Sequence, residues 1–247
     1  MVDCTSFIFS HIPKCGGTSF REFIYNSAKS SDIPSDDLYI PGYNGLNVNK
    51  NLTQLSHREL LSFSNGSYRV VAMHVPYGIH RSYSAMGERP LYFTLFRDPL
   101  ERFLSHYYFF YYRQGAVGCK GKHLSELPTS KRASLFSNLS NIYASYILGD
   151  VKSGIYDVPQ VLDTVIANLE SPNYIYGDLS NVEDALAILS VALPSWLELL
   201  PIFPRVNSNS FNAEYRTQIP EQIIEEFRSM NALDLMIYDY VKTSLAT

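Results

Sequence analysis

The stretch that decides the fold lies near the start of the chain and reads Thr5-Ser6-Phe7-Ile8-Phe9-Ser10-His11-Ile12-Pro13-Lys14-Cys15-Gly16-Gly17-Thr18-Ser19. Its first six residues form a short apolar run, which predicts a strand that ends at a turn rich in proline and glycine. From Thr18 to about Ala28, apolar side chains recur on one helical face, so a helix is expected to follow the turn.

The same alternation of strand and helix continues along the chain. Residues 68–73 and 91–96 are mainly apolar or aromatic, which is typical of strands buried on both faces of a parallel sheet, and residues 174–176 predict a fourth strand. Helices are expected at residues 54–63, 99–112, 130–148, 158–169, 180–192, 220–230 and 232–245. A long loop or a loose hairpin is expected at 30–51, and a loop at 115–128. This order predicts an α/β fold, a P-loop-like three-layer α/β/α arrangement around a central, mostly parallel sheet.

Composition narrows the class of protein. The chain has 247 residues, of which 46% are hydrophobic, 14% aromatic and 18% charged, which excludes a disordered protein. At roughly 150 residues per domain the length allows one or two domains. Because no Pro/Gly/Ser-rich linker separates two cores, we expect a single domain over residues 1–247. The net charge of −4 argues against a general nucleic-acid binder and against binding to an anionic membrane.

The cysteines and the first residues of the sequence bear on the cellular compartment in which the protein is expected. Cys4, Cys15 and Cys119 are odd in number and lack paired spacing, so neither a disulfide framework nor a zinc site is expected. No run approaches the ~20 apolar residues of a membrane span, and the first residues do not resemble a signal peptide. We therefore expect a cytoplasmic protein. A Golgi-lumenal or membrane-anchored location would be expected only if an N-terminal anchor had been removed. The sequence does not indicate the oligomeric state.

A candidate anion site lies between the first strand and the first helix. Free backbone N–H groups and the positive end of the helix dipole favour an anion there. The candidate ligands are Lys14, Gly16, Gly17, Thr18 and Ser19, which supply a charge, an open backbone and two hydroxyls. The lysine precedes the glycines, so this is not a Walker A loop. A Gly-Gly turn without a function is the alternative.

A second candidate anion site follows the third strand. Arg97 leaves the carboxyl end of that strand, where open α/β sheets bind their ligands. Asp98 and Pro99 predict an N-cap and a first helical residue, and Ser105 lies two turns further. Arg97 and Ser105 can therefore converge on an anion. The alternative is an ordinary surface pair of Arg97 with Asp98 or Glu101.

Two anion sites at one sheet suggest a ligand phosphorylated at two positions, such as an adenosine with a 5′ diester-like anion and a 3′-phosphate. The two motifs resemble those of the sulfotransferases that use 3′-phosphoadenosine 5′-phosphosulfate (PAPS). The resemblance is to the family-2 type, which includes the heparan sulfate 2-O-sulfotransferases and bacterial family-2 enzymes. It covers about residues 5–112. The first motif departs from the family at Cys15, where threonine is usual, whereas the second matches at Arg97, Asp98, Pro99, Arg102, Ser105 and Tyr107.

The resemblance implies a reaction and a set of roles. PAPS would be the co-substrate, 3′-phosphoadenosine 5′-phosphate (PAP) the product, and no metal would be needed. Lys14 would neutralise the leaving 5′-phosphate, and residues 15–19, namely Cys15, Gly16, Gly17, Thr18 and Ser19, would hold the phosphosulfate. Arg97 and Ser105 would bind the 3′-phosphate. Arg205 and Ser208 resemble a late family loop near the donor and are further candidates, with an ordinary turn as the alternative.

The acceptor hydroxyl needs a base, and histidine is the usual choice near neutral pH. Of six histidines, His74 directly follows the second strand, at the sheet edge expected for both anion sites. It also occupies the position of the base in the family resembled. His80 is the reserve candidate and a candidate acceptor contact. His11 is interpreted as a structural support for the loop.

The acceptor is expected to be a hydroxyl of a carbohydrate or small metabolite. Net negative charge argues mildly against a long polyanion, although a few acidic groups could bind a local basic cluster of Arg113, Lys120, Lys122, Lys131 and Arg132. Two alternatives stay open. One is a catalytically inactive scaffold or sensor that binds PAP or PAPS. The other is a nucleotide-dependent kinase, which would require a Walker-type loop and an aspartate for Mg²⁺.

Overall fold

The computed structural model describes residues 4–42, 66–82, 88–148, 158–203 and 219–246. Within them lies a five-stranded sheet of order β2-β3-β1-β4-β5, in which each adjoining pair is parallel. The strands are β1 (Ser6–Ser10), β2 (Leu38–Tyr39), β3 (Val70–Met73), β4 (Pro90–Phe96) and β5 (Tyr174–Asp178). The predicted α/β fold with a parallel sheet is thereby confirmed.

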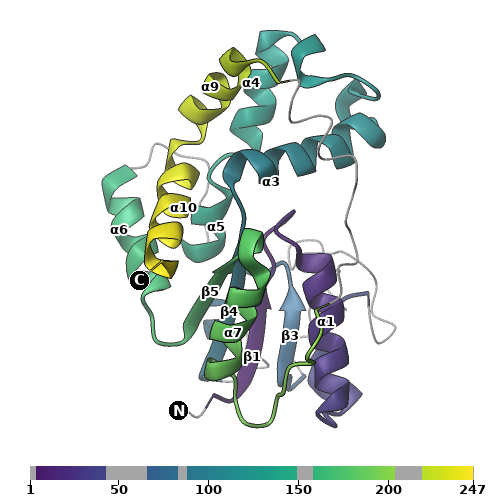
Figure 1. Cartoon of the computed structure of the whole chain (residues 1–247), viewed down its shortest axis with the longest axis vertical. Helices are drawn as coiled ribbons and strands as arrows, with labels where there is room; N and C mark the ends of the chain where they lie inside the picture. Colours follow the sequence, from purple (N-terminus) through teal and green to yellow (C-terminus); the bar gives the residue numbers. More distant parts are fainter. Residues whose placement is uncertain (1–3, 43–65, 83–87, 149–157, 204–218, 247) are drawn as a thin grey trace.

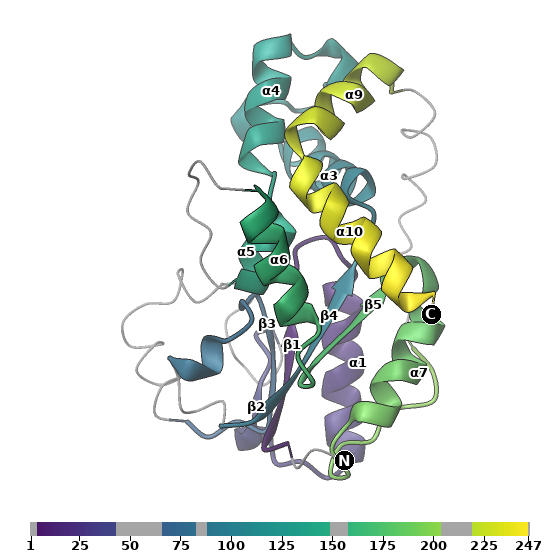
Figure 2. The same ribbon diagram turned by 90° about the vertical axis from the view of Figure 1, so that its left-hand side faces the viewer.

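Both faces of the sheet are covered by helices (Figures 1 and 2). On one face, α1 (Gly17–Ser30) and α7 (Val182–Ala192) pack against the side chains of Phe7 and Phe9. On the other face, α5 (Ile142–Leu148), α6 (Val158–Leu169) and α10 (Ala232–Leu245) pack against Ile8 and its neighbours. Alternate residues of β1 thus enter two different cores. This explains why the central strands are apolar throughout rather than alternating with polar residues.

A third group of helices lies beyond the carboxyl edge of the sheet (Figure 1). It contains α3 (Pro99–His106), a π-helical continuation over Tyr107–Arg113, α4 (Thr129–Asn138) and α9 (Glu221–Met230). The predicted start of α3 is confirmed: Oδ1 of Asp98 accepts a hydrogen bond from Glu101 N at 2.9 Å, and Pro99 is the first helical residue. Two short 3-10 helices, Ala116–Gly118 and Leu124–Glu126, interrupt the loop expected at 115–128.

Some expectations about local structure are wrong. The helix predicted over 130–148 is two helices, because α4 ends at Asn138 and α5 begins at Ile142, where a distant carboxylate accepts its first N–H groups. The segment 30–51 was expected to be a loop or a loose hairpin, and its described part contains a 3-10 turn (Ser35–Asp37) and the two-residue strand β2, which pairs in parallel with β3.

The helix predicted to begin at Ser180 begins two residues later, at Val182. Ser180 N donates to Asp178, which caps a 3-10 turn (Leu179–Asn181) ahead of α7. The helix predicted at 54–63 lies outside the described residues. The other predicted helices, at 158–169, 220–230 and 232–245, are present. In the described part of the chain, no helix is both long enough and apolar enough to cross a membrane.

Candidate active site

The topology brings three candidate residues to one edge of the sheet. β3, β1 and β4 are neighbours in parallel register, so His74, His11 and Arg97 all follow the carboxyl ends of adjoining strands. The loops after β1 and β4 are bonded to each other, since Nη1 of Arg97 donates to the carbonyl oxygen of Lys14 at 3.2 Å. The predicted convergence of the two loops at one edge is therefore confirmed.

The loop after β1 contains two glycines that neighbouring side chains approach closely. Gly16 has φ +77° and precedes α1, whose N-terminus receives no side-chain cap from the part of the chain that is described. A Cβ at Gly16 would lie 2.6 Å from Cδ1 of Leu179, and one at Gly17 would lie 1.8 Å from the ring of His11. Both positions therefore require glycine, and the uncapped N–H groups of α1 can face an anion.

Lys14 brings positive charge to this loop. Its φ of +69° is in the left-handed region, and its ammonium lies 4.1 Å from the ring centroid of Phe109 in the π-helical segment. Burial lowers the pKa of Lys14, and the nearby charges of Arg97 and Arg113 lower it further. Three cations thus gather at the mouth of the loop, where a bound anion would relieve their repulsion.

The hydroxyls and the thiol of the loop differ in orientation and exposure. Thr18 is exposed and Ser19 is buried. The Cys15 side chain is only 1% exposed, and burial raises the pKa of its thiol to about 12. Cys15 N donates to the carbonyl of Ile12 at 3.2 Å, so its N–H is also occupied. The Cys15 side chain packs in the core, and a donor contact by Cys15 stays a prediction.

Arg97 is held at both ends. Its carbonyl oxygen accepts a hydrogen bond from the hydroxyl of Tyr143, and its guanidinium bonds Lys14 O and pairs with Glu101 at 3.4 Å. The predicted alternative, a pair with Glu101, is thus present, yet Arg97 also reaches the loop after β1. Ser105 is half-buried two turns along α3. A joint 3′-phosphate site of Arg97 and Ser105 stays a prediction.

His74 is held in a defined tautomer. Its Nδ1 lies 2.7 Å from the carbonyl oxygen of His11, and because a carbonyl only accepts, that nitrogen carries the proton. Nε2 is then unprotonated, as a general base requires. Burial lowers the pKa of His74 to about 4, although the His11 carbonyl acts in the opposite direction, so the ring is neutral near pH 7. The hydroxyl of Tyr146 also approaches Nδ1, at 3.3 Å.

His11 supports both the loop and His74, as its interpretation as a structural residue predicts. Its buried ring stacks on the His74 ring with centroids 4.1 Å apart, and the same ring covers Gly17. Burial lowers the pKa of His11 well below its usual value. The charge of buried Arg21 in α1 lowers the pKa of both histidines, a role that the sequence did not signal.

His80 is separated from the other candidates. Its Nδ1 lies 2.8 Å from the hydroxyl of Tyr92, which is in the first half of β4 opposite Ile8. His80 therefore lies over the sheet face rather than at the edge with His74, and an acceptor contact by His80 stays a prediction. Arg205 and Ser208 lie outside the described residues.

The predicted basic cluster is smaller than expected. Arg132 is buried, donates to the Leu127 carbonyl and pairs with Glu226 at 2.9 Å, so its charge is already compensated. Lys131 donates to the carbonyl of Val117 at 2.6 Å. Among the residues placed by the structure, no group of three His, Cys, Asp or Glu side chains could hold a metal ion. A reaction without a metal remains a prediction.

Comparison with known proteins agrees with this geometry. Residues 1–148 match the model of the sulfotransferase family. That segment includes both candidate anion loops and His74. The chain is also 25% identical over 256 residues to heparan sulfate 2-O-sulfotransferase hst-2 of Caenorhabditis elegans, an alignment that spans 95% of this chain and 76% of that protein.

Proposed function

The chain belongs to the sulfotransferase family, and on that premise we propose that it transfers a sulfuryl group from PAPS to a hydroxyl of a carbohydrate or small metabolite. The observation that carries the proposal is the bond between Arg97 and the Lys14 carbonyl, which joins two cationic loops at one sheet edge. A donor with anions at both its 5′ and 3′ positions matches two such loops.

The residues present fit this donor. Positions 16 and 17 require glycine, and α1 has no side-chain cap at its N-terminus in the described part of the chain. Lys14 adds a partly buried cation beside this helix end. These groups suit the phosphosulfate, while Arg97 and Ser105 suit the 3′-phosphate. Because Cys15 faces the core, its replacement of the usual threonine removes no side chain from the open side of the loop.

The proposed chemistry needs a base and charge stabilisation. The bound donor supplies the sulfuryl group and a 5′-phosphate as leaving group. The acceptor oxygen forms a bond to sulfur, the bond from sulfur to the 5′-phosphate oxygen breaks, and the acceptor proton passes to Nε2 of His74. The neutral state and tautomer of His74 support this role. Lys14 stabilises the negative charge on the departing phosphate.

The proposed acceptor class draws on the relative whose name includes heparan sulfate. We propose a carbohydrate hydroxyl first and a small metabolite second. Arg132 is already paired with Glu226, and the exposed Lys120 and Lys122 suit an acceptor with few acidic groups better than a dense polyanion.

Calorimetric titration with PAP, adenosine 5′-phosphosulfate and ATP, without added metal, tests the donor. Selective binding of PAP supports the proposal, whereas Mg²⁺-dependent binding of ATP alone would favour the kinase alternative. Arg97→Ala should weaken PAP binding by ~1.5–3 kcal/mol, the range for a hydrogen bond to a charged group. Unchanged PAP affinity in that variant would remove Arg97 from the donor site.

Replacement of His74 tests the base. His74→Ala should lower kcat by roughly 10²–10⁴-fold and leave PAP affinity nearly intact. His123→Ala, a change to a histidine that packs against Tyr112, is the matched control and should keep full activity. Full turnover by His74→Ala would exclude His74 as the base. If the wild-type protein binds PAP but sulfates nothing in an acceptor screen, the scaffold alternative is favoured.

A further inference from the structure

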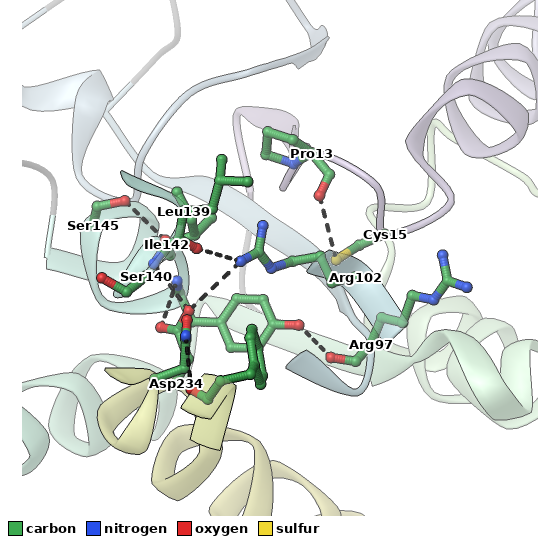
Figure 3. Close-up of polar contacts among 12 residues, drawn as sticks. Pro13, Cys15, Arg97, Arg102, Leu139, Ser140, Ile142, Ser145 and Asp234 are labelled. Atoms are coloured by element: carbon green, nitrogen blue, oxygen red, sulfur yellow. Dashed lines mark hydrogen bonds and ion pairs between the residues drawn. The ribbon is translucent and has the colours of Figure 1, made fainter. Parts of the chain in front are cut away.

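A buried polar network lies directly behind Arg97 (Figure 3), and it consists of Asp234, Arg102, Tyr143 and Cys15. Asp234, Arg102 and Tyr143 have no assigned part in the reaction. We propose that Tyr143, fixed in turn by Asp234, is a positioning residue that holds Arg97 in place for the donor's 3′-phosphate. This inference rests on the proposed function.

The network begins at Asp234 in α10, whose side chain is 0% exposed. Its two carboxylate oxygens accept hydrogen bonds from the N–H groups of Ile142 and Tyr143, each at 3.0 Å. Asp234 therefore caps α5 with a full carboxylate, which satisfies N–H groups that the helix leaves open and interacts favourably with its dipole. Tyr143 is thus anchored through its own backbone.

Arg102 of α3 locks this cap in position. Its side chain is 1% exposed, and Nη2 lies 4.0 Å from Oδ2 of Asp234 and 2.6 Å from the carbonyl oxygen of Leu139. Two opposite charges buried together are held strongly, because moving either one alone would leave the other uncompensated. The N-terminal turn of α5 therefore has a fixed position relative to both α3 and α10.

Tyr143 carries that fixed position to the donor edge. Its ring is completely buried and packs edge-on against Phe96, with centroids 5.1 Å apart, which restricts the direction of the hydroxyl. The hydroxyl donates to the carbonyl oxygen of Arg97, at the end of β4 where the chain turns into α3. The backbone from which the Arg97 guanidinium extends is thereby held from inside the core.

The same line of hydrogen bonds continues through Arg97 to Lys14, because the guanidinium donates to the Lys14 carbonyl. Loss of the Tyr143 hydroxyl would leave the Arg97 carbonyl without this donor and free the peptide to reorient. The direct effect falls on Arg97 and hence on a 3′-phosphate. The glycine backbone and the N-terminus of α1, which face the 5′ group, keep their own supports in His11 and Leu179.

The test compares ligands with and without a 3′-phosphate. Tyr143→Phe in the full chain should raise the Kd of PAP by roughly 3- to 10-fold, the effect of about one net hydrogen bond, and change that of adenosine 5′-phosphosulfate by less than about twofold. Tyr176→Phe is the matched control, because the Tyr176 hydroxyl bonds Ser244 at 2.7 Å and the ring packs on the same core. Its two Kd values should equal those of the wild type.

The ratio of the two Kd values decides the outcome. It does not depend on the folded fraction, which the fitted stoichiometry reports separately. An unchanged ratio in Tyr143→Phe, or an equal loss for both ligands, overturns the positioning role while the wild-type selectivity for PAP still stands. A wild-type protein that does not prefer PAP overturns the proposed function, and this inference with it.

Discussion

The two loops at the donor edge are held in place by different kinds of interaction. The loop over residues 11–19 is shaped by close packing, with the ring of His11 on Gly17 and the side chain of Leu179 on Gly16. The loop that begins at Arg97 is held by a hydrogen bond from Tyr143 and, behind it, by buried charge. The first depends mainly on shape, and the second depends on electrostatics supplied by helices far along the chain. Substitutions should therefore affect the two loops differently.

The largest expected effect comes from removing the buried charge. Asp234→Ala leaves Arg102 unpaired in the core and α5 without its cap, and should lower the free energy of unfolding by about 3–5 kcal/mol. Urea unfolding measures this. Asp239→Ala, an exposed position on the same helix, should change stability by less than about 0.5 kcal/mol. Equal effects of the two variants would mean that the second loop does not depend on buried charge.

The packing of the first loop is tested by Gly17→Ala. The new Cβ would displace the His11 ring, which should cost about 1–3 kcal/mol of stability and greatly weaken PAP binding. Gly118→Ala is the control, because Gly118 has φ +71° but no atom within 4 Å of its Cβ position. It should lose about 1–2 kcal/mol from backbone strain and keep its affinity for PAP. A Gly17→Ala protein that binds PAP normally would contradict the packing argument.

Acid should affect the buried histidines and the buried carboxyl of Asp234 in opposite directions. Burial lowers the pKa of His11 well below the ordinary 6.5 and lowers the pKa values of His74 and His106 to about 4. Between pH 6.5 and 4 the unfolded chain binds protons that these folded histidines do not, so stability falls as the pH falls. Burial raises the pKa of Asp234 to about 6. As the pH falls, its carboxyl therefore binds a proton in the folded state before it does so in the unfolded state, which stabilises the fold and opposes the effect of the histidines.

Burial lowers the pKa of His80 as well, so four histidines act against this one carboxyl, and the melting temperature should fall by several degrees between pH 7.5 and pH 5. Thermal unfolding at a series of pH values measures it. His106→Phe should reduce the fall, since one of the four groups is removed. A melting temperature that rises on acidification would show that Asp234 outweighs the histidines.

The smallest effect is expected at the N-cap of α3, which directly follows Arg97. Asp98→Ala removes the N-cap of α3 and should cost about 1 kcal/mol, whereas Asp98→Asn keeps a capping oxygen and should be nearly neutral. Chemical denaturation of both variants measures the difference. A loss as large as that of Asp234→Ala would mean that the local cap, and not the distant network, holds this loop.

The sequence predicted the parts of the fold that depend on neighbouring residues. The apolar runs of β1, β3 and β4 are visible without knowledge of the rest of the chain, and parallel topology alone places Lys14, His74 and Arg97 at one edge. The break between α4 and α5 was not predicted, because the carboxylate that caps α5 belongs to Asp234, far along the chain. Strand β2 was missed because its two residues lie in a polar segment and become a strand only beside β3.

The candidate site shows the same limit. A motif names residue types but not the direction of each side chain, so it did not indicate that the Cys15 side chain is buried in the core. Arg132 was counted as a free surface cation because its partner, Glu226, lies in a distant helix. Tyr143 and Arg21 carried no sequence signal, since a buried polar side chain acquires its role only from what packs around it.

The position of Asp234, far after Lys14, His74 and Arg97 in the sequence, also has a consequence for how the protein is made. Lys14, His74 and Arg97 leave the ribosome long before α10 does. Until α10 arrives, a nascent chain holds Arg102 without its counter-charge and α5 without its cap. We expect the donor site to gain its final shape only after α10 has been synthesised, so that chains truncated before α10 do not sequester the nucleotide.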